Sequence, residues 1–277
     1  MTAYLRPRDL GEALDARAAH PDWMVLAGAT DLMVSAGHRP EPAGILDLWR
    51  LRELCGIEAG EGAVAIGAGA TWSEVERHPV IRERLAPLAL AAREIGALQI
   101  QARATLGGNV GTSSPVGDSL PVLLALDATL EVASARGRRR VPYREWCTGY
   151  RTTQLGPDEL IVSATLPLPG ASTRTTWRKV GTRRAQSIAK VMGAAAIELD
   201  GDTVVAARVA LGAVADRPIR IAAVEDAVRG QRIGGAAADA ARTALRAAIR
   251  PIDDVRSTAA YRREVAENLV ARFFAVS

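Results

Sequence analysis

The chain reads Thr105-Leu106-Gly107-Gly108-Asn109-Val110-Gly111-Thr112-Ser113-Ser114-Pro115-Val116-Gly117-Asp118 near its middle. This stretch combines glycines, small hydroxyl side chains, one amide and one carboxylate. Glycines let backbone N–H groups donate directly to a phosphate, and Thr and Ser hydroxyls donate to its remaining oxygens. Asp118 would then accept a hydrogen bond from a ribose hydroxyl. A flexible surface loop is the alternative, but the apolar segments on both sides favour a packed loop that binds a nucleotide.

A second candidate site lies closer to the N-terminus and reads Leu26-Ala27-Gly28-Ala29-Thr30-Asp31. The pattern is typical of a strand, a tight turn and the start of a helix. A helix N-terminus presents free backbone N–H groups to an anion, and Gly28 permits close approach or a positive φ. Taken alone, an ordinary turn capped by Thr30 or Asp31 is the better interpretation.

A third candidate is the basic segment that begins Arg178-Lys179-Val180-Gly181 and continues to Ser187. Lys179, at the junction of a predicted strand and turn, is either simply exposed or places a positive charge on a reduced cofactor. The chain contains neither G-x-G-x-x-G nor a Walker A motif, which disfavours the Rossmann and P-loop modes of nucleotide binding. The three histidines are isolated and do not indicate a metal site; they are His20, His38 and His78.

The composition is that of an ordinary globular protein. Of 277 residues, 48% are hydrophobic and 24% charged, which argues against a disordered or fibrous chain. The pI of about 9.5 is a weak indication of a nucleic-acid partner, because arginines and acids are interleaved. The one dense basic run, residues 136–140, is expected to be a solvated strand edge or loop.

The cysteines and the N-terminus bear on location and metal content. Cys55 and Cys147 are far apart and lack C-x-x-C spacing, which argues against a zinc or iron–sulfur site in this chain and fits a reducing compartment. The first ten residues do not resemble a signal peptide, and no uncharged apolar run approaches the length of a membrane span. We therefore expect a cytoplasmic protein with no membrane span and no nucleic-acid partner.

Periodicity and capping signals predict alternating helices and strands. Asp9 and Thr71 each begin a capping box, and the Pro- and Gly-containing residues 167–172 form the best domain boundary. Helices are predicted over residues 10–18, from 31, from 72, and over 79–95, 120–126, 219–228, 236–249 and 258–275. The last should bury one face, Tyr261, Val265, Leu269 and Phe273. Strands are predicted at 24–27, 45–48, 64–67, 128–133, 138–141, 159–166, 177–180, 189–199 and 203–213, with a hairpin around Gly137.

These segments, in this order and spacing, resemble the flavin subunit of the molybdenum hydroxylases, the family of xanthine dehydrogenase and aerobic carbon monoxide dehydrogenase. The resemblance covers nearly the whole chain and adds a C-terminal motif that reads Pro251-Ile252-Asp253-Asp254-Val255-Arg256-Ser257-Thr258, followed by Tyr261-Arg262. It implies an α+β fold of the vanillyl-alcohol-oxidase type. Residues 1–170 would form the FAD-binding domain, with subdomains 1–54 and 55–170. Residues 171–277 would form a C-terminal domain of a small antiparallel sheet and helices.

The resemblance also implies the cofactor contacts. Backbone at residues 27–31 and 107–109 would hold the FAD pyrophosphate, Asp118 would bind the ribose side, and Lys179 would lie near the flavin ring, where a cation stabilises the charge of the reduced form. No His or Cys is placed to attach the flavin, so FAD is expected to bind non-covalently. The full set of expected cofactor-binding residues is Ala27, Gly28, Ala29, Thr30, Asp31, Thr105, Gly107, Gly108, Asn109, Thr112, Ser114, Asp118, Ile161 and Lys179.

Three positions depart from the family pattern. Ala29 stands where a second glycine is frequent, so the first turn must accommodate a Cβ atom. Ile95 stands where some members stack an aromatic ring on the flavin. Gln186 and Ser187 replace an acidic pair of some members, which argues against assuming NAD as the electron acceptor.

The leading hypothesis is a subunit that passes electrons from a partner's [2Fe-2S] clusters to an external acceptor. The clusters and the molybdopterin would lie on a small and a large partner chain, in a dimer of heterotrimers, and the acceptor would be a small molecule or a quinone. The alternatives are a self-contained flavin oxidoreductase of the same fold and a nucleotide-binding scaffold without a redox role.

Overall fold

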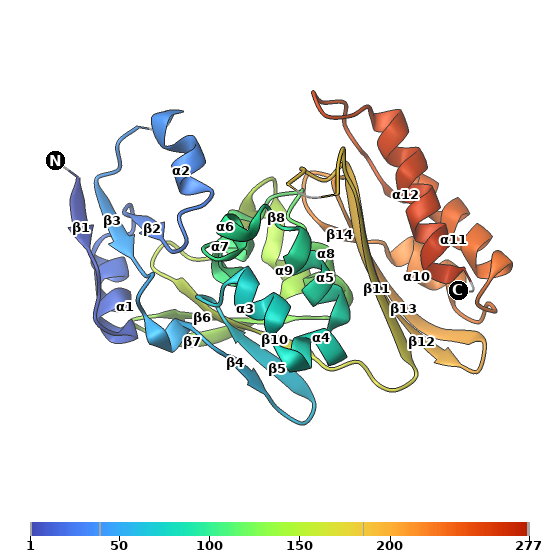
Figure 1. Ribbon diagram of the computed structural model, residues 1–277, viewed down its shortest axis with the longest axis horizontal. Coiled ribbons are helices and arrows are strands. Elements are labelled where there is room, and N and C mark those ends of the chain that lie inside the picture. Colours follow the sequence, from blue (N-terminus) through green and yellow to red (C-terminus); the bar gives the residue numbers. More distant parts are fainter. Residues whose placement is uncertain (1, 39, 185, 276–277) are drawn as a thin grey trace.

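The computed structural model describes residues 2–38, 40–184 and 186–275. Three sheets follow one another along the long axis of the molecule, in the order of the sequence (Figure 1). The N-terminus lies at one end, and the last helix covers the far side of the third sheet. Within the described residues, no helix is long and apolar enough to cross a membrane.

The first lobe is a small parallel sheet of order β1-β3-β2. Helix α1 begins after Asp9, whose carboxylate accepts from the Glu12 amide at 2.8 Å. The capping box predicted there is only half formed, because Glu12 instead accepts from the Arg8 amide. The lobe packs onto strands of the second sheet through a shared apolar cluster. Its elements are β1 Ala3–Leu5, α1 Leu10–Ala19, β2 Met24–Leu26, α2 Leu32–Ser35, a 3-10 turn Ala36–His38 and β3 Gly44–Asp47.

The second lobe is an antiparallel sheet of order β4-β5-β10-β6-β7. The capping box at Thr71 is complete and begins α3. The single helix predicted over 79–95 is wrong: it breaks at Leu85 because Pro87, in the first turn of α5, cannot donate a backbone hydrogen bond. The strands are β4 Ile57–Ala59, β5 Ala63–Gly67, β6 Thr129–Ser134, β7 Gly137–Pro142 and β10 Leu160–Pro167.

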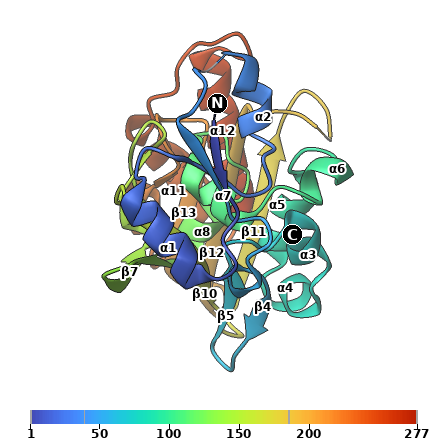
Figure 2. The same cartoon turned by 90° about the vertical axis from the view of Figure 1, so that its left-hand side faces the viewer.

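Seven short helices cover one face of this sheet (Figure 1), and Figure 2 shows all of them but the last from the side of the first lobe. They are α3 Trp72–Arg77, α4 Pro79–Arg84, α5 Ala86–Glu94, α6 Leu98–Gln101, α7 Leu106–Thr112, α8 Leu120–Ala125 and α9 Tyr143–Trp146. A 3-10 turn Arg52–Leu54 and a two-stranded ribbon, β8 Cys147–Gly149 with β9 Thr152–Thr153, complete the lobe.

The third lobe is an antiparallel sheet of order β11-β12-β13-β14, whose central strands are buried on both faces. Along β12, Ala194 and Ala196 join the core of the second lobe, whereas Ala195 and Ile197 pack on the C-terminal helices. This alternation follows from the two-residue period of a strand. The elements are β11 Thr173–Val180, β12 Val191–Asp200, β13 Thr203–Gly212, β14 Ile219–Arg220, α10 Ala222–Val228, α11 Gly235–Ala248 and α12 Ala259–Phe274.

Two predictions for this lobe need correction. The helix predicted over 219–228 begins only at α10, because Ile219 and Arg220 pair with β13 as β14. The predicted buried face of α12 holds for Leu269 and Phe273, but Tyr261 is 42% exposed. Its ring lies instead against the ammonium group of Lys190.

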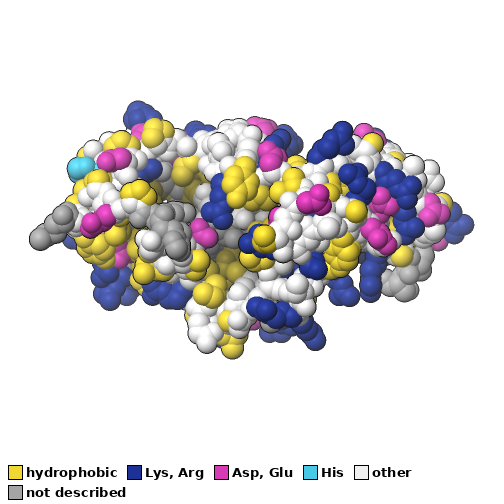
Figure 3. All heavy atoms as spheres, turned by 90° about the horizontal axis from the view of Figure 1, so that it is seen from above, with side chains coloured by type: hydrophobic (Ala, Val, Ile, Leu, Met, Phe, Trp, Pro, Cys, Tyr) yellow, Lys and Arg dark blue, Asp and Glu magenta, His cyan; other side chains and the backbone are white. Residues whose placement is uncertain are grey.

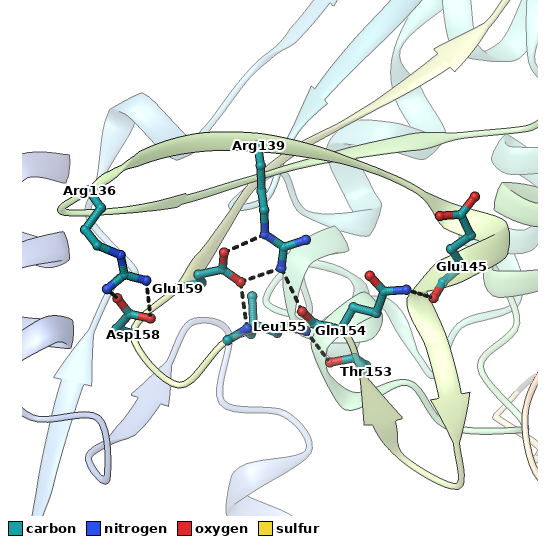
Figure 4. A network of polar contacts seen from close by, with 9 residues as sticks. Arg136, Arg139, Glu145, Thr153, Gln154, Leu155, Asp158 and Glu159 are labelled. Carbon is teal, nitrogen blue, oxygen red and sulfur yellow. Dashed lines mark hydrogen bonds and ion pairs between the residues drawn. The ribbon is translucent and has the colours of Figure 1, made fainter.

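The dense basic run lies on the β6–β7 hairpin, as predicted, with Gly137 in its turn at φ 138°. Figure 4 shows Arg136 and Arg139 reaching from this hairpin to Asp158 and Glu159. The Arg139–Glu159 pair is bidentate, at 2.7 and 2.6 Å. These two arginines of the run are therefore neutralised locally.

Candidate functional site

The turn that follows β2 brings the first lobe against the second. A Cβ atom on Gly28 would lie 1.8 Å from the Arg103 carbonyl oxygen, so glycine is required here by backbone packing. Ala29 has φ 64°, which means that this turn holds its Cβ atom in the left-handed region. Within the described residues, the backbone N–H groups of Gly28, Ala29 and Thr30 donate no hydrogen bond. They are therefore available to an anion.

The first half of the Gly-rich stretch is the helix α7, Leu106–Thr112, and not the predicted loop, whereas residues 113–118 form turns and irregular backbone. Thr105 caps α7 by accepting from the Gly108 amide at 3.0 Å. The Gly107 amide donates to Ala68, just after β5, and the Asn109 amide to the Thr105 carbonyl. A Cβ atom on Gly107 would lie 2.7 Å from that of Ala68. These glycines serve close packing of α7, and their amides already have acceptors within the protein.

The remaining residues of the stretch hold α7 in place. Asn109 accepts a hydrogen bond from the Ser119 hydroxyl at 2.6 Å, and the Ser114 hydroxyl accepts from the Val116 amide. Thr112 is half-buried and ends the helix. Ile161 lies under α7, since its Cδ1 atom would be 3.6 Å from a Cβ atom on Gly111.

Asp118 and Lys179 form a buried ion pair. The Lys179 ammonium donates to Asp118 Oδ2 at 2.7 Å and to the Glu94 carbonyl at 3.2 Å. The two side chains are 10% and 3% exposed, respectively. Burial raises the pKa of Asp118 to about 6, against the opposing charge of Lys179. Asp118 Oδ1 is buried without a hydrogen-bond partner in the described structure, which is costly unless a ligand donates to it.

Two neighbouring cavities link these features. The Gly28 turn lines a cavity of about 500 Å³, and Asp118 lines another of about 320 Å³. Ile100, just after Ile95 and Gly96 at the end of α5, lines both. Figure 3 looks onto this side of the molecule, where hydrophobic side chains border the hollows between the lobes. The two cavities meeting at one residue fit an elongated ligand.

Ile100 and Arg103 are among the residues lining these cavities that no sequence motif indicated. Ile100 lies on the short helix α6, and Arg103 lines the larger cavity with its guanidinium 3.7 Å from the Trp49 ring. Neither residue belongs to a recognisable motif, because one aliphatic side chain or one of many arginines gives no sequence signal. In the basic segment from Arg178 to Ser187, Ala185 lies outside the described residues. Gln186 and Ser187 line the smaller cavity.

The chain matches family models along most of its length. Residues 1–169 match the model of the FAD binding domain in molybdopterin dehydrogenase. The chain belongs to this family of FAD-binding subunits. Residues 177–276 match the CO dehydrogenase flavoprotein C-terminal domain. The resemblance and the α+β fold expected from the sequence are thereby confirmed.

Relatives align over nearly their whole length. The glyceraldehyde dehydrogenase medium chain of Sulfolobus acidocaldarius is 30% identical over 98% of this chain and 96% of its own. The nicotinate dehydrogenase FAD-subunit of Eubacterium barkeri is 27% identical over 98% and 94%. Among solved structures, carbon monoxide dehydrogenase from Hydrogenophaga pseudoflava superposes with a TM-score of 0.94 at 30% identity, covering 98% of this chain and 95% of that one.

The residues of this FAD-binding subunit fit the cofactor. FAD is long, doubly anionic at its pyrophosphate and rich in hydroxyl groups. Free amides at Gly28–Thr30 suit the anion, and the orphaned oxygen of Asp118 suits a hydroxyl donor. The two cavities that share Ile100 lie between these amides and Asp118.

Proposed function

We propose that this subunit carries FAD as an electron-transfer station between a partner's [2Fe-2S] clusters and an external acceptor. The observation that carries the proposal is the pair of cavities meeting at Ile100, with free amides at one end and a buried carboxylate at the other. FAD supplies the redox chemistry when it is bound. The protein residues bind it, orient it and shield it from water.

The two ends of the proposed FAD site would bind different parts of the cofactor. The amides of Gly28, Ala29 and Thr30 would hold the pyrophosphate, with α7 as the wall beside it. Asp118 Oδ1 would accept from a hydroxyl group of the cofactor. Lys179, held by Asp118 and the Glu94 carbonyl, would supply positive charge on the flavin side of the site. The remaining expected contacts belong to the same proposal and are Ala27, Asp31, Thr112, Ser114 and Ile161. Thr105, Gly107, Gly108 and Asn109 would contribute as part of the α7 wall, because the amides of residues 107–109 already have acceptors within the protein.

The proposal includes partners because this chain has only two cysteines, fewer than a [2Fe-2S] cluster needs. Relatives of the same length are named as subunits of dehydrogenases for nicotinate, glyceraldehyde and carbon monoxide. A scaffold shared by such different substrates points to substrate selection on another chain. A small [2Fe-2S] chain and a large molybdopterin chain, in a cytoplasmic dimer of heterotrimers with a small-molecule or quinone acceptor, complete the proposal.

Reconstitution tests this division of labour. Substrate-dependent dye reduction is measured for this chain alone, for the partner chains alone, and for the mixture. We expect full electron transfer to the flavin only in the mixture. Turnover of substrate by this chain alone, with partners absent, would favour a self-contained oxidoreductase.

The mode of FAD binding is tested separately by acid precipitation of the purified chain. The yellow colour should move into the supernatant, because no side chain is expected to attach the flavin. Colour that stays in the pellet contradicts non-covalent binding, and a chain that never takes up FAD leaves only a scaffold without a redox role.

A further inference from the structure

Trp177 holds the backbone of Asp118 from a different element of the fold. Its indole Nε1 donates to the Asp118 carbonyl oxygen at 3.0 Å, and its side chain is 5% exposed. Trp177 and Lys179 are two residues apart on β11, so both side chains point to the same face of the sheet. Asp118 is therefore held twice by one strand, at its carbonyl through Trp177 and at its carboxylate through Lys179.

We propose that Trp177 is a positioning residue for the cofactor site, which aims the free carboxylate oxygen of Asp118 into its cavity by fixing the Asp118 backbone. The inference rests on the proposed FAD function. Nothing in the sequence around Trp177 marks it as part of a binding motif. Its role follows from a contact between residues that are 59 positions apart.

The physical argument concerns one rotatable side chain. Lys179 fixes Oδ2 of Asp118 by a hydrogen bond. The position of Oδ1 then depends on the direction of the Cα–Cβ bond, so Oδ1 faces a donor in the cavity only while that direction is kept. That direction is set by the backbone, and a carbonyl deprived of a buried donor moves to find another partner, because an unsatisfied buried acceptor is costly. Without the indole N–H, the Asp118–Lys179 ion pair can persist while Oδ1 of Asp118 no longer points into the cavity.

A positioning role predicts a dependence on pH that a packing role does not. Asp118 binds a hydroxyl donor more strongly when it is ionised, and burial raises its pKa to about 6. The charged groups that face it are Lys179 on β11 and Glu94 at the end of α5. The loop residues that line the same cavity carry no charge.

The test compares FAD affinity of full-length Trp177→Phe with that of the wild type at about pH 8 and about pH 5. Phenylalanine keeps an aromatic ring and removes the N–H donor. We expect roughly tenfold weaker binding at the higher pH, and a smaller difference at the lower pH. In an Asp118→Asn background, Trp177→Phe should have little further effect, because the two residues act as one unit.

Trp72→Phe is the matched control. Trp72 is fully buried in the same apolar cluster, and its indole nitrogen has no hydrogen-bond partner in the described part of the chain. This variant should bind FAD like the wild type at both pH values. Equal, pH-independent weakening in both tryptophan variants would show a packing effect and overturn the inference.

Two further outcomes separate the inference from the proposed function. If Asp118→Asn weakens binding and Trp177→Phe does not, the positioning role is wrong and the FAD site stands. If the wild type binds no FAD, the proposed function itself fails. If Trp177→Phe does not fold, the NMR resonance of the Trp177 indole N–H in the wild type is measured as a function of pH. It should shift as Asp118 titrates. The same shift in Asp118→Asn would refute the coupling between the two residues.

Discussion

Asp118 combines a buried charge with an unsatisfied oxygen atom, and this predicts its importance for the cofactor. Asp118→Asn should weaken FAD binding about ten- to a hundredfold, since a charge-assisted hydrogen bond contributes roughly 1.5–3 kcal/mol. Asp202→Asn is the control, because Asp202 is 69% exposed and forms a surface ion pair with Arg232. Fluorescence titration of FAD measures both affinities. Equal affinities would remove Asp118 from the site.

The raised pKa of Asp118 also predicts how stability depends on pH. Because the folded pKa is about 6 against an ordinary value of 3.8, the folded state binds the proton more tightly than the unfolded state. Its contribution is favourable at low pH, and it is lost as pH rises from 3.8 to about 6. The loss amounts to at most about 3 kcal/mol.

The measurement is urea unfolding of the FAD-free wild type and of Asp118→Asn across this pH range. The difference in free energy of unfolding, wild type minus variant, should decrease with rising pH and then level off. A constant difference would mean that Asp118 has an ordinary pKa.

Ala29 carries backbone strain at φ 64°. The left-handed conformation destabilises the folded state by roughly 1–2 kcal/mol for a residue with a Cβ atom. Glycine avoids this cost, but its greater freedom in the unfolded chain offsets about 0.4–1 kcal/mol of the gain. Ala29→Gly should therefore stabilise the protein by about 0.5–1 kcal/mol without loss of FAD affinity. Ala240→Gly, inside helix α11, should instead destabilise by about 1 kcal/mol. Thermal unfolding of both variants checks the sign.

At the scale of one element, the glycines of α7 differ in what surrounds them. A Cβ atom on Gly111 would make an ordinary contact with Ile161, at 3.6 Å, whereas one on Gly107 would lie 2.7 Å from the Cβ atom of Ala68. Gly111→Ala should stabilise the FAD-free protein by about 0.5–1 kcal/mol, because alanine favours a helix. Gly107→Ala should destabilise it by about 1–3 kcal/mol through overpacking. The same sign for both substitutions would contradict the packing described for α7.

At the scale of the whole molecule, the third sheet contributes side chains to two apolar cores, one shared with the second lobe and one with the C-terminal helices. Trp177, Ala194 and Ala210 lie in the apolar cluster of the second lobe, and Lys179 and Trp177 hold Asp118. Although the sequence predicts a boundary near residue 170, residues 1–170 expressed alone should bind FAD at least tenfold more weakly than the full chain. Co-expression of residues 171–277 should restore binding. Equal affinity of the truncated chain would show that the C-terminal lobe is dispensable for the site.

Much of the local structure was predictable because its causes lie within a few residues. Thr71 and Glu74 form a helix cap across one turn, and Gly137 permits the tight turn of the β6–β7 hairpin. The nearly continuous apolar runs of β12 and β13, with the turn residues of 200–202 between them, predict two strands buried on both faces. The motifs around Gly28, Gly107 and Asp118, together with the Lys179 segment and the C-terminal motif, were also sufficient to recognise the family, because they occur in the same order and spacing over nearly the whole chain.

The arrangement of the site depended on contacts that no local pattern encodes. The stretch with three glycines is a helix because its first amides find acceptors at Ala68 and Ala70, beyond β5. Asp118 and Lys179 were recognised separately, yet only the packing of β11 on the second lobe makes them an ion pair 61 positions apart. Helix caps and strand periods act over one turn or one strand, so they are readable in sequence. Burial, orphaned polar atoms and cavities arise where distant segments meet, and these decide which residues of the motifs can reach a cofactor.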